Sequence, residues 1–376
     1  MVDSETFYNA LRSAGIDFFA GVPDSLLGPI CACIADKAPE GKHHITANEG
    51  AAVALAAGWY LGTAKPAMVY MQNSGLGNAV NPLLSLADNS VYGIPMLIMI
   101  GWRGEPGVKD EPQHIAQGAV MESMLESMGI SYHRLPESTA DAASLIKEMR
   151  AQTEAEQKPV ALLVSKNAFT PYASEVCEDG GSLPMSREQA IAIMIASIEG
   201  DSTIVSSTGM ISRELYELRE QSGSNHDRDF LTVGSMGHCS QIALGVALAN
   251  THKKVFCLDG DGAALMHMGS MAIIAHSGAA NFTHVILNNA SHGSVGGQPT
   301  CGFEISFTDI AKGYGYVSAS SVSNEADLVD ALQGIQDANG PSLIEIKVAA
   351  GNREDLGRPG MSLKEQKEAF MKYLGT

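Results

Sequence analysis

Polar side chains stand at two points where neighbouring strands are expected to end. Asp261 follows the apolar stretch 255–258 within the run Asp-Gly-Asp-Gly, and Asn288 and Asn289 close the next apolar stretch, "THVILNN". The spacing from Asp261 to Asn288 is that of one turn, helix and strand, so adjacent parallel strands would bring both side chains to the same sheet edge. A carboxylate and an amide oxygen are hard ligands that suit Mg²⁺, which also binds phosphate oxygens.

Glycines flank Asp261 and give this run a second use. Gly260, Gly262 and Ala263 would present backbone N–H groups to a phosphate at the start of the following helix. Gly-Asp-Gly alone is common in turns, and by itself the run favours a structural turn. The asparagine pair at the end of the next strand shifts the balance towards a metal and phosphate site.

Together these residues resemble the signature of the thiamine diphosphate-dependent enzymes. The resemblance implies that Asp261, Asn288 and the backbone carbonyl of Ala290 hold Mg²⁺ on the diphosphate of thiamine diphosphate. It also implies a glutamate in the first half of the chain, which is Glu49 in "TANEGAAVALAAGWYLGT". The carboxyl group of such a glutamate hydrogen-bonds to the aminopyrimidine ring of the cofactor and promotes its deprotonation. Alone, Glu49 would be interpreted as a first-turn glutamate that stabilises a helix N-terminus.

Two further segments match the same signature. In "LTVGSMGHCSQIALGVALA", Met236 fits the bulky apolar residue that props the cofactor in its bent shape, and the carbonyl of Gly234 would accept from the cofactor amino group. A methionine among glycines could equally be plain core. In "SSTGMISREL", Thr208, Gly209 and Met210 are the candidates for an additional diphosphate loop.

The elements that must position these residues alternate between short apolar strands and helices in both halves of the chain. Repeated strand–helix–strand units imply right-handed crossovers and a mostly parallel sheet, with ligands beyond the carboxyl ends of the strands. The sequence therefore predicts an α/β protein of two doubly wound, mostly parallel-sheet domains of the thiamine diphosphate-binding fold. In the first half, helices are expected over 49–61, 76–88 and 141–156, and His43 and His44 indicate a solvated edge. The expected parts are a pyrimidine-binding domain over 1–167, a linker rich in Pro, Gly, Ser and acidic residues over 168–184, and a diphosphate-binding domain with a C-terminal tail over 185–376.

The composition limits the partners of the protein. The chain has 376 residues, 45% of them hydrophobic, and a formal net charge of -18, which argues against nucleic-acid binding. We find no signal-peptide pattern and no apolar run long enough to span a membrane. Six cysteines without a zinc-type spacing favour reduced thiols and a cytoplasmic location.

The layout narrows the resemblance, since only a linker lies where larger pyruvate decarboxylases and acetolactate synthases carry a third domain. The resemblance, narrowed in this way, implies decarboxylation of a small anionic 2-oxo acid, 3-phosphonopyruvate, to phosphonoacetaldehyde and CO₂ in phosphonate biosynthesis. The sulfonate analogue, transfer to a second carbonyl in a carboligase reaction, and a silent regulatory subunit are the alternatives, and Glu49 argues against the last. Cations must meet the anionic substrate, and the candidates are Arg103, Lys109, Arg353 and Arg358.

Groups that could move protons also lie on expected loops. Asp24 and Ser25 follow "FFAGVP", where relatives place an acidic or hydroxyl side chain over the thiazolium ring. His114 ends "KDEPQH" and His292 lies in "NNASHGS". A histidine titrates near neutral pH, so either ring could donate or accept as the product forms, although single histidines are more often structural.

Two last expectations concern the assembly and one rejected class. Because Glu49 and Asp261 lie on different domains and the family builds its site from two subunits, we expect a homodimer or a larger homo-oligomer. A nicotinamide dehydrogenase is disfavoured, because "SGLGNAV" has Val80 where the dinucleotide fingerprint needs its third glycine. The segment also follows the third expected strand and not the first.

Overall fold

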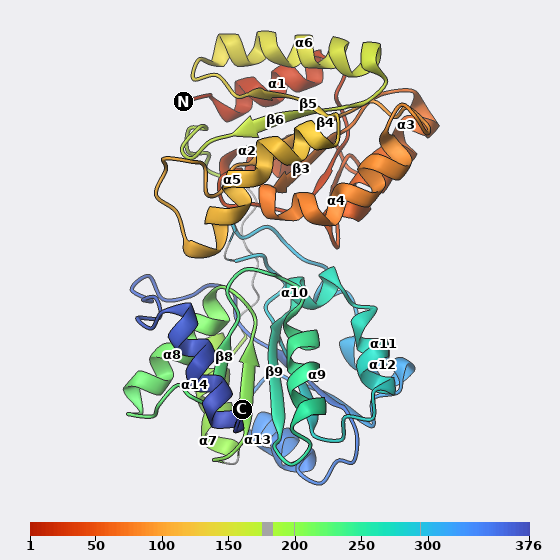
Figure 1. The fold of residues 1–376 in the computed structure, drawn as a ribbon. Coiled ribbons are helices and arrows are strands. Elements are labelled where there is room, and N and C mark those ends of the chain that lie inside the picture. The colour runs from red at the N-terminus through yellow and green to blue at the C-terminus, as the bar shows by residue number, and fades with distance from the viewer. Residues whose placement is uncertain (175–182, 199, 294) are drawn as a thin grey trace. The chain divides into compact units, whose positions relative to one another are not determined.

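The computed structural model describes residues 1–174, 183–198, 200–293 and 295–376. The chain divides into two compact units, residues 1–177 and 178–376, each built as a layered α/β domain (Figure 1).

Much of the predicted linker, residues 175–182, lies outside the described residues. Its first residues pack with the first unit, because Val2 and Phe169 form a parallel bridge and Phe169 is buried in the core.

The first unit is a six-stranded sheet in the order β2-β1-β3-β4-β6-β5, with every pairing parallel. This confirms the doubly wound fold for the first half of the chain. Its elements are α1 (Ser4–Ser13), β1 (Phe19–Gly21), α2 (Gly28–Lys37), β2 (His43–Ile45), α3 (Glu49–Thr63), β3 (Met68–Gln72), the 3-10 turn η1 (Asn73–Gly75), α4 (Leu76–Pro82), the π turn η2 (Leu83–Ala87), β4 (Met96–Gly101), α5 (Pro112–Ser127), β5 (Ser131–Arg134), α6 (Thr139–Glu156) and β6 (Pro159–Val164).

Side chains of the central strand β4 alternate between two cores, as the two-residue repeat of a strand requires. Ile98 and Ile100 point into the core under α3, α4 and α5, whereas Leu97 and Met99 point into the core under α1, α2 and α6. Both faces of the sheet are therefore covered, which explains the unbroken apolar run of β4. The helix expected over 76–88 changes at Pro82 from α4 to a π turn, because proline has no N–H to donate.

The second unit is another all-parallel six-stranded sheet, in the order β11-β12-β10-β9-β7-β8. Helices α7, α8 and α13 cover one face, and α9 to α12 with α14 cover the other. Its elements are α7 (Arg187–Ser197), β7 (Thr203–Ser206), α8 (Met210–Gln221), β8 (Asp229–Leu231), α9 (Cys239–Ala249), β9 (Val255–Gly260), α10 (Asp261–Met266), α11 (Ser270–His276), β10 (Phe282–Asn288), α12 (Phe307–Tyr314), β11 (Ser318–Val322), α13 (Glu325–Gly334), β12 (Ser342–Lys347) and α14 (Leu363–Leu374).

The two sheets have the same strand order when each is counted from its own first strand. In both, the second strand lies outside the first, and the fifth lies outside the sixth at the other edge. The order reverses between β1 and β3 and between β7 and β9, and ligands of doubly wound sheets bind beyond the carboxyl ends at such points. No helix among the described residues has the length and apolar character of a membrane span.

Candidate active site

Asp261 and Asn288 meet at the carboxyl edge of the second sheet. Asp261 begins α10 directly after β9, Asn288 is the last residue of the adjacent strand β10, and both are buried. A Cβ atom on Gly302 would clash with Oδ1 of Asn288 and with Oδ2 of Asp261, so both oxygens converge on one point that only a glycine leaves open. The two side chains therefore bring together two oxygen atoms of the kind that Mg²⁺ prefers.

Neighbouring groups orient this pair. The side-chain nitrogen of Asn288 donates to the carbonyl of Gly302 at 2.7 Å and to Oε1 of Glu345 at 2.7 Å, and the amide oxygen accepts from the N–H of Ala290 at 3.1 Å. The hydroxyl of Thr300 donates to Oδ2 of Asp261. Glu345 was not anticipated from the sequence, although a carboxylate inside the apolar stretch "PSLIEIKV" is a signal that could have identified it.

Burial sets the charge behaviour of Asp261. Desolvation raises the pKa of its carboxyl group to about 6, against the opposing hydrogen bond from Thr300. A carboxylate held in such a place is stabilised by a cation, since the charged form otherwise lacks compensation. The backbone carbonyl of Ala290, which has a positive φ of 53°, accepts from the N–H of Thr300 at 2.8 Å in this structure.

The loops after β7 and β8 lie together beside this pair. The hydroxyl of Thr208 accepts from the N–H of Gly234 at 3.0 Å, and Gly209 and Gly234 both have positive φ angles. Met236 and His292 approach Gly262, since a Cβ there would lie 3.5 Å from Cε of Met236 and 2.8 Å from Cε1 of His292. Burial lowers the pKa of His292 to about 4. One edge of the second sheet thus gathers these candidates, in its loops or at the adjoining ends of a strand and two helices: residues 208–210, Gly234, Met236, Gly260, Gly262, Ala263 and His292.

Glu49 stands at the corresponding edge of the first sheet. It is the first residue of α3, whose N-cap is Asn48, and it is only 4% exposed. The side chain of Asn78 donates to Oε2 of Glu49 at 2.8 Å, and a Cβ on Gly75 would clash with the Glu49 carboxyl group. Burial sets Glu49 apart from an ordinary first-turn glutamate in solvent.

The two residues predicted after β1 differ in their access to solvent. Asp24 is fully buried and accepts from the side chain of Gln72 at 2.6 Å and from the N–H of Leu26 at 3.0 Å. Desolvation raises the pKa of Asp24 above its usual value. Ser25 is exposed, and its hydroxyl accepts from Nη1 of Arg103 at 2.9 Å.

Arg103 and His114 share one partner that was not anticipated from the sequence. Asp110 accepts from Nε of Arg103 at 2.8 Å and from Nη2 at 2.5 Å, and Nδ1 of His114 lies 3.0 Å from Oδ1 of Asp110. The structure thereby brings together two of the predicted residues, while Lys109 stands exposed in the same loop. Asp110 lies in the quoted segment "KDEPQH", but spacing alone did not separate it from Glu111.

The basic residues of the C-terminal tail have other surroundings. Arg353 forms ion pairs with Glu188 at 2.9 Å, with Asp355 at 2.9 Å, and with Glu217, while Arg358 is exposed. Three carboxylates compete with any anionic ligand for the Arg353 guanidinium group. This arrangement fastens the tail to α7 and α8.

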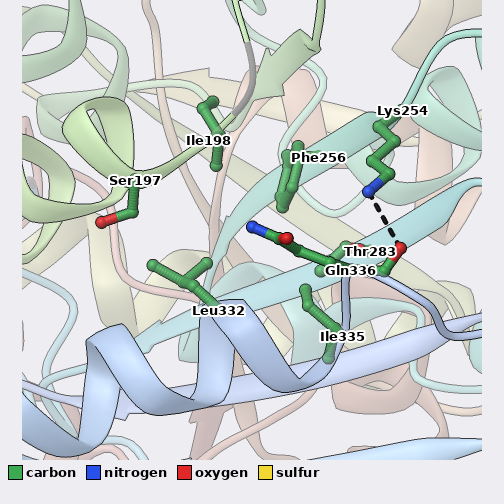
Figure 2. A pocket seen from close by; sticks show the side chains of 8 residues that line it. All are labelled: Ser197, Ile198, Lys254, Phe256, Thr283, Leu332, Ile335 and Gln336. Carbon is green, nitrogen blue, oxygen red and sulfur yellow. Dashed lines mark hydrogen bonds between the residues drawn. The ribbon is translucent and has the colours of Figure 1, made fainter.

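A small cavity of the second unit lies at the opposite ends of the strands (Figure 2). It has a volume of about 20 Å³, room for about one water molecule. Lys254, directly before β9, donates to the carbonyl of Gln336 at 2.9 Å across its rim, and Thr283 stands near the start of β10. The cavity therefore lies away from the carboxyl edge where Asp261 and Asn288 meet.

Both units match a known family. Residues 2–125 match the N-terminal TPP binding domain of thiamine pyrophosphate enzymes, and residues 205–346 match their C-terminal TPP binding domain. The chain belongs to the thiamine pyrophosphate enzymes, which confirms the resemblance drawn from the sequence.

Three relatives extend over nearly the whole chain. Two are named phosphonopyruvate decarboxylase: one from Streptomyces viridochromogenes, 31% identical over 100% of this chain and 96% of its own length, and one from Streptomyces hygroscopicus, 32% identical over 99% and 94%. A third, named sulfopyruvate decarboxylase, from Methanosarcina acetivorans, is 28% identical over 98% and 97%.

Proposed function

We propose that this protein decarboxylates 3-phosphonopyruvate to phosphonoacetaldehyde and CO₂ with thiamine diphosphate and Mg²⁺, as a step of phosphonate biosynthesis. The observation that carries the proposal is the full-length similarity to two phosphonopyruvate decarboxylases, at 31% and 32% identity. The buried Glu49 carboxyl group and the converging oxygens of Asp261 and Asn288 also support the proposal, because their chemistry suits this cofactor and its metal ion.

The residues at the edge of the second sheet fit a diphosphate-bound Mg²⁺ ion. Asp261 and Asn288 supply converging oxygens, and Gly302 keeps the point between them open. Ala290 would add its carbonyl after giving up the hydrogen bond from Thr300. The loops of Thr208–Met210 and Gly260–Ala263 would contact the phosphate oxygens, and Gly234 and Met236 the rest of the cofactor.

Residues of the first unit would handle protons and charge. When bound, thiamine diphosphate supplies an electron sink for the bond that releases CO₂. The Glu49 carboxyl group would share a proton with the aminopyrimidine nitrogen. Arg103, Lys109, Arg353 and Arg358 are the candidate cations for the substrate, and Asp24, Ser25, His114 and His292 the candidate groups for proton transfer to the product.

The exposed face of α3 supports a homodimer. Ala51, Ala54, Leu55, Gly58 and Leu61 follow a helical repeat and are all exposed, with Leu61 at 71%. A continuous apolar stripe on an outer helix is a face that a partner subunit covers. We propose that a second copy of this chain does so, and light scattering after size-exclusion chromatography tests it: a monomer with full activity contradicts the proposal.

One substrate comparison tests the proposed reaction. The protein is freed of metal with EDTA, resupplied with Mg²⁺ and thiamine diphosphate, and offered phosphonopyruvate, sulfopyruvate and pyruvate separately. We expect phosphonopyruvate to have the highest kcat/KM, with phosphonoacetaldehyde identified by ³¹P NMR. Pyruvate as the preferred substrate would overturn the specificity and leave the cofactor assignment intact.

Sulfopyruvate is a second candidate, favoured by the full-length relative from Methanosarcina acetivorans. Phosphonate and sulfonate have similar shapes and differ in charge, so the same assay separates them. An added aldehyde acceptor tests the carboligase alternative, which predicts a coupled product and a loss of free aldehyde.

A further inference from the structure

We propose that Asp110 is a positioning residue that holds Arg103 and His114 as one unit and fixes the ring nitrogen of His114 that carries the proton. This inference rests on the proposed function, because it assigns the orientation of two candidate substrate-site groups. It starts from the five donors that meet at the Asp110 carboxylate.

The oxygens of Asp110 are fully used. Oδ2 accepts from Nε of Arg103 and from the N–H of Gly104, both at 2.8 Å. Oδ1 accepts from Nη2 of Arg103 and from the N–H of Glu111 at 2.7 Å, and it also faces Nδ1 of His114 at 3.0 Å. A carboxylate offers about four lone-pair positions, so this one is saturated by its neighbours.

The charge of Asp110 decides the direction of the bond to His114. The hydrogen bond from Arg103 holds the pKa of the Asp110 carboxyl group well below its usual range. An ionised carboxylate only accepts, and therefore Nδ1 of His114 must carry the hydrogen. In the neutral ring, Nε2 then keeps its lone pair and is the nitrogen left to exchange a proton with a ligand.

The backbone around this assembly is held in place. Asn73, directly after β3, donates to the carbonyl of Arg103 at 2.8 Å and accepts from its N–H at 3.1 Å. A Cβ on Gly104 would clash with the main chain of His114, and a Cβ on Gly118 would clash with the main chain of Gly104. The indole of Trp102 donates to the carbonyl of Gly118 at 2.9 Å. The loop is thus fastened to α5 as well as to the sheet.

The assembly presents two groups at a fixed separation. Nη1 of Arg103, the guanidinium nitrogen not used by Asp110, donates to the exposed hydroxyl of Ser25. Together they offer donors to an oxyanion such as a carboxylate or phosphonate. Because Asp110 neutralises most of the Arg103 charge, recognition of an oxyanion by Arg103 and Ser25 depends on the direction of their hydrogen bonds more than on net charge. His114 would stand beside it with Nε2 ready to take part in proton transfer.

The wild-type protein gives the first test. In protein labelled with ¹⁵N-histidine, the His114 signals are assigned by their loss in His114→Gln, and the chemical shifts tell which nitrogen is protonated. We expect the Nδ1–H form in the neutral ring. An Nε2–H form in the wild type overturns the proposal, and this result does not depend on which substrate the protein uses.

The variant Asp110→Asn gives the second test. With the amide oxygen in the place of Oδ2, it keeps Nε of Arg103, and the amide N–H in the place of Oδ1 faces Nδ1 while the contacts with Nη2 of Arg103 and the N–H of Glu111 are lost. We therefore expect the His114 ring to change to the Nε2–H form. The value of kcat should fall by about 10²–10⁴-fold, the usual contribution of a proton-transfer group. An unchanged tautomer with kcat within twofold of wild type contradicts the proposal.

A matched control exists in the same unit. Asp88 pairs with Lys158 at 3.2 Å and is 16% exposed at its side chain, close to the 12% of Asp110, but it precedes β4 at the other end of the sheet. Asp88→Asn should leave the His114 signals and kcat unchanged. Absence of phosphonopyruvate turnover in the wild type would refute the proposed function, whereas the wild-type tautomer would still decide the role of Asp110.

Discussion

The two halves of this chain have one topology and two kinds of chemistry. In the first unit, Asn73 directly follows β3 and Arg103 lies in the loop after β4; in the second, Asp261 directly follows the corresponding strand β9, and Asn288 is the last residue of β10. The first edge gathers an ion pair, a histidine and buried carboxyl groups. The second gathers glycines, a histidine with a lowered pKa, and the two oxygen atoms of Asp261 and Asn288 that converge near Gly302.

The contrast shows that the fold fixes where a site lies and leaves its chemistry to the residues at the strand ends. Under the proposed function, the first unit moves protons and orients the substrate, and the second unit binds metal and diphosphate. Substitutions at the two edges should therefore have different effects. Those in the first unit should lower turnover, and those in the second unit should lower the affinity for metal and cofactor.

The largest effect is expected for Glu49→Gln in the first unit. An amide cannot share a proton with the cofactor as a carboxyl group does, so kcat should fall by at least about 10³-fold. Binding of Mg²⁺ and thiamine diphosphate, measured by calorimetry, should change little. Glu40→Gln, an exposed glutamate on the other side of β2, is the matched control. Full activity of Glu49→Gln would contradict the assignment of the proton transfer to the first unit.

Asp261→Asn should produce the opposite pattern. Loss of the carboxylate charge should weaken Mg²⁺ binding by at least about 100-fold, since even residues behind metal ligands contribute 10–100-fold. Turnover should recover in part at high Mg²⁺, which Glu49→Gln should not do. The exposed Asp330 of α13 gives the control Asp330→Asn. If both variants lose turnover while keeping full metal affinity, the proposed division between the units is wrong.

A pair of glycine variants tests the same contrast with smaller expected effects. A Cβ on Gly75 meets the carboxyl group of Glu49, and a Cβ on Gly302 meets the oxygens of Asp261 and Asn288. We expect Gly75→Ala to lower kcat by about tenfold at constant cofactor affinity, since a one-ångström shift of a reacting group has large effects. Gly302→Ala should raise the Mg²⁺ concentration for half activity by a similar factor. The reverse assignment of the two phenotypes contradicts the proposed division of roles between the two units.

Much of the fold followed from the sequence, and the omissions are the same in both units. Five strands of each half were predicted, whereas β5 and β11 were not. Nearly all of the predicted strands are buried apolar runs, and the exception is β2, which is only partly buried. The sequences of β5 and β11, "SYHR" and "SASSV", are polar or partly exposed edge strands, so they lack the apolar run of a strand covered on both faces. Strand pairing alone identifies them.

Residues of the candidate site could be predicted where they lie in a recognisable sequence motif, but not where they act through a hydrogen-bond network. Asp261 and Asn288 lie in a motif with fixed spacing, and Glu49 lies in a segment that resembles one of the family. Asp110 and Glu345 act through partners that are distant in sequence or indistinguishable by spacing, and only the folded chain identifies those contacts. The three carboxylates around Arg353 are a further case, because an isolated arginine in a glycine-rich tail gives no sign of them.

Substitution of His43 in β2 should have the smallest effect on turnover. Its effect should instead be on stability. The sequence indicated a solvated edge, but His43 is partly buried and its Nε2 lies 2.7 Å from the hydroxyl of Tyr70. Burial lowers the pKa of His43 to about 4 from 6.5, so the folded state holds the ring neutral while the unfolded chain protonates it.

Stability should therefore fall as the pH drops from about 6.5 towards 4, by about 2–3 kcal/mol from this group. His43→Gln should reduce that fall and leave kcat at pH 7.5 unchanged, whereas the exposed His252→Gln of the second unit should not affect it. Both tryptophans, Trp59 and Trp102, belong to the first unit, so urea unfolding followed by tryptophan fluorescence reports on that unit. An equal acid sensitivity of wild type and His43→Gln would place the acid-labile groups elsewhere and remove this difference between the units.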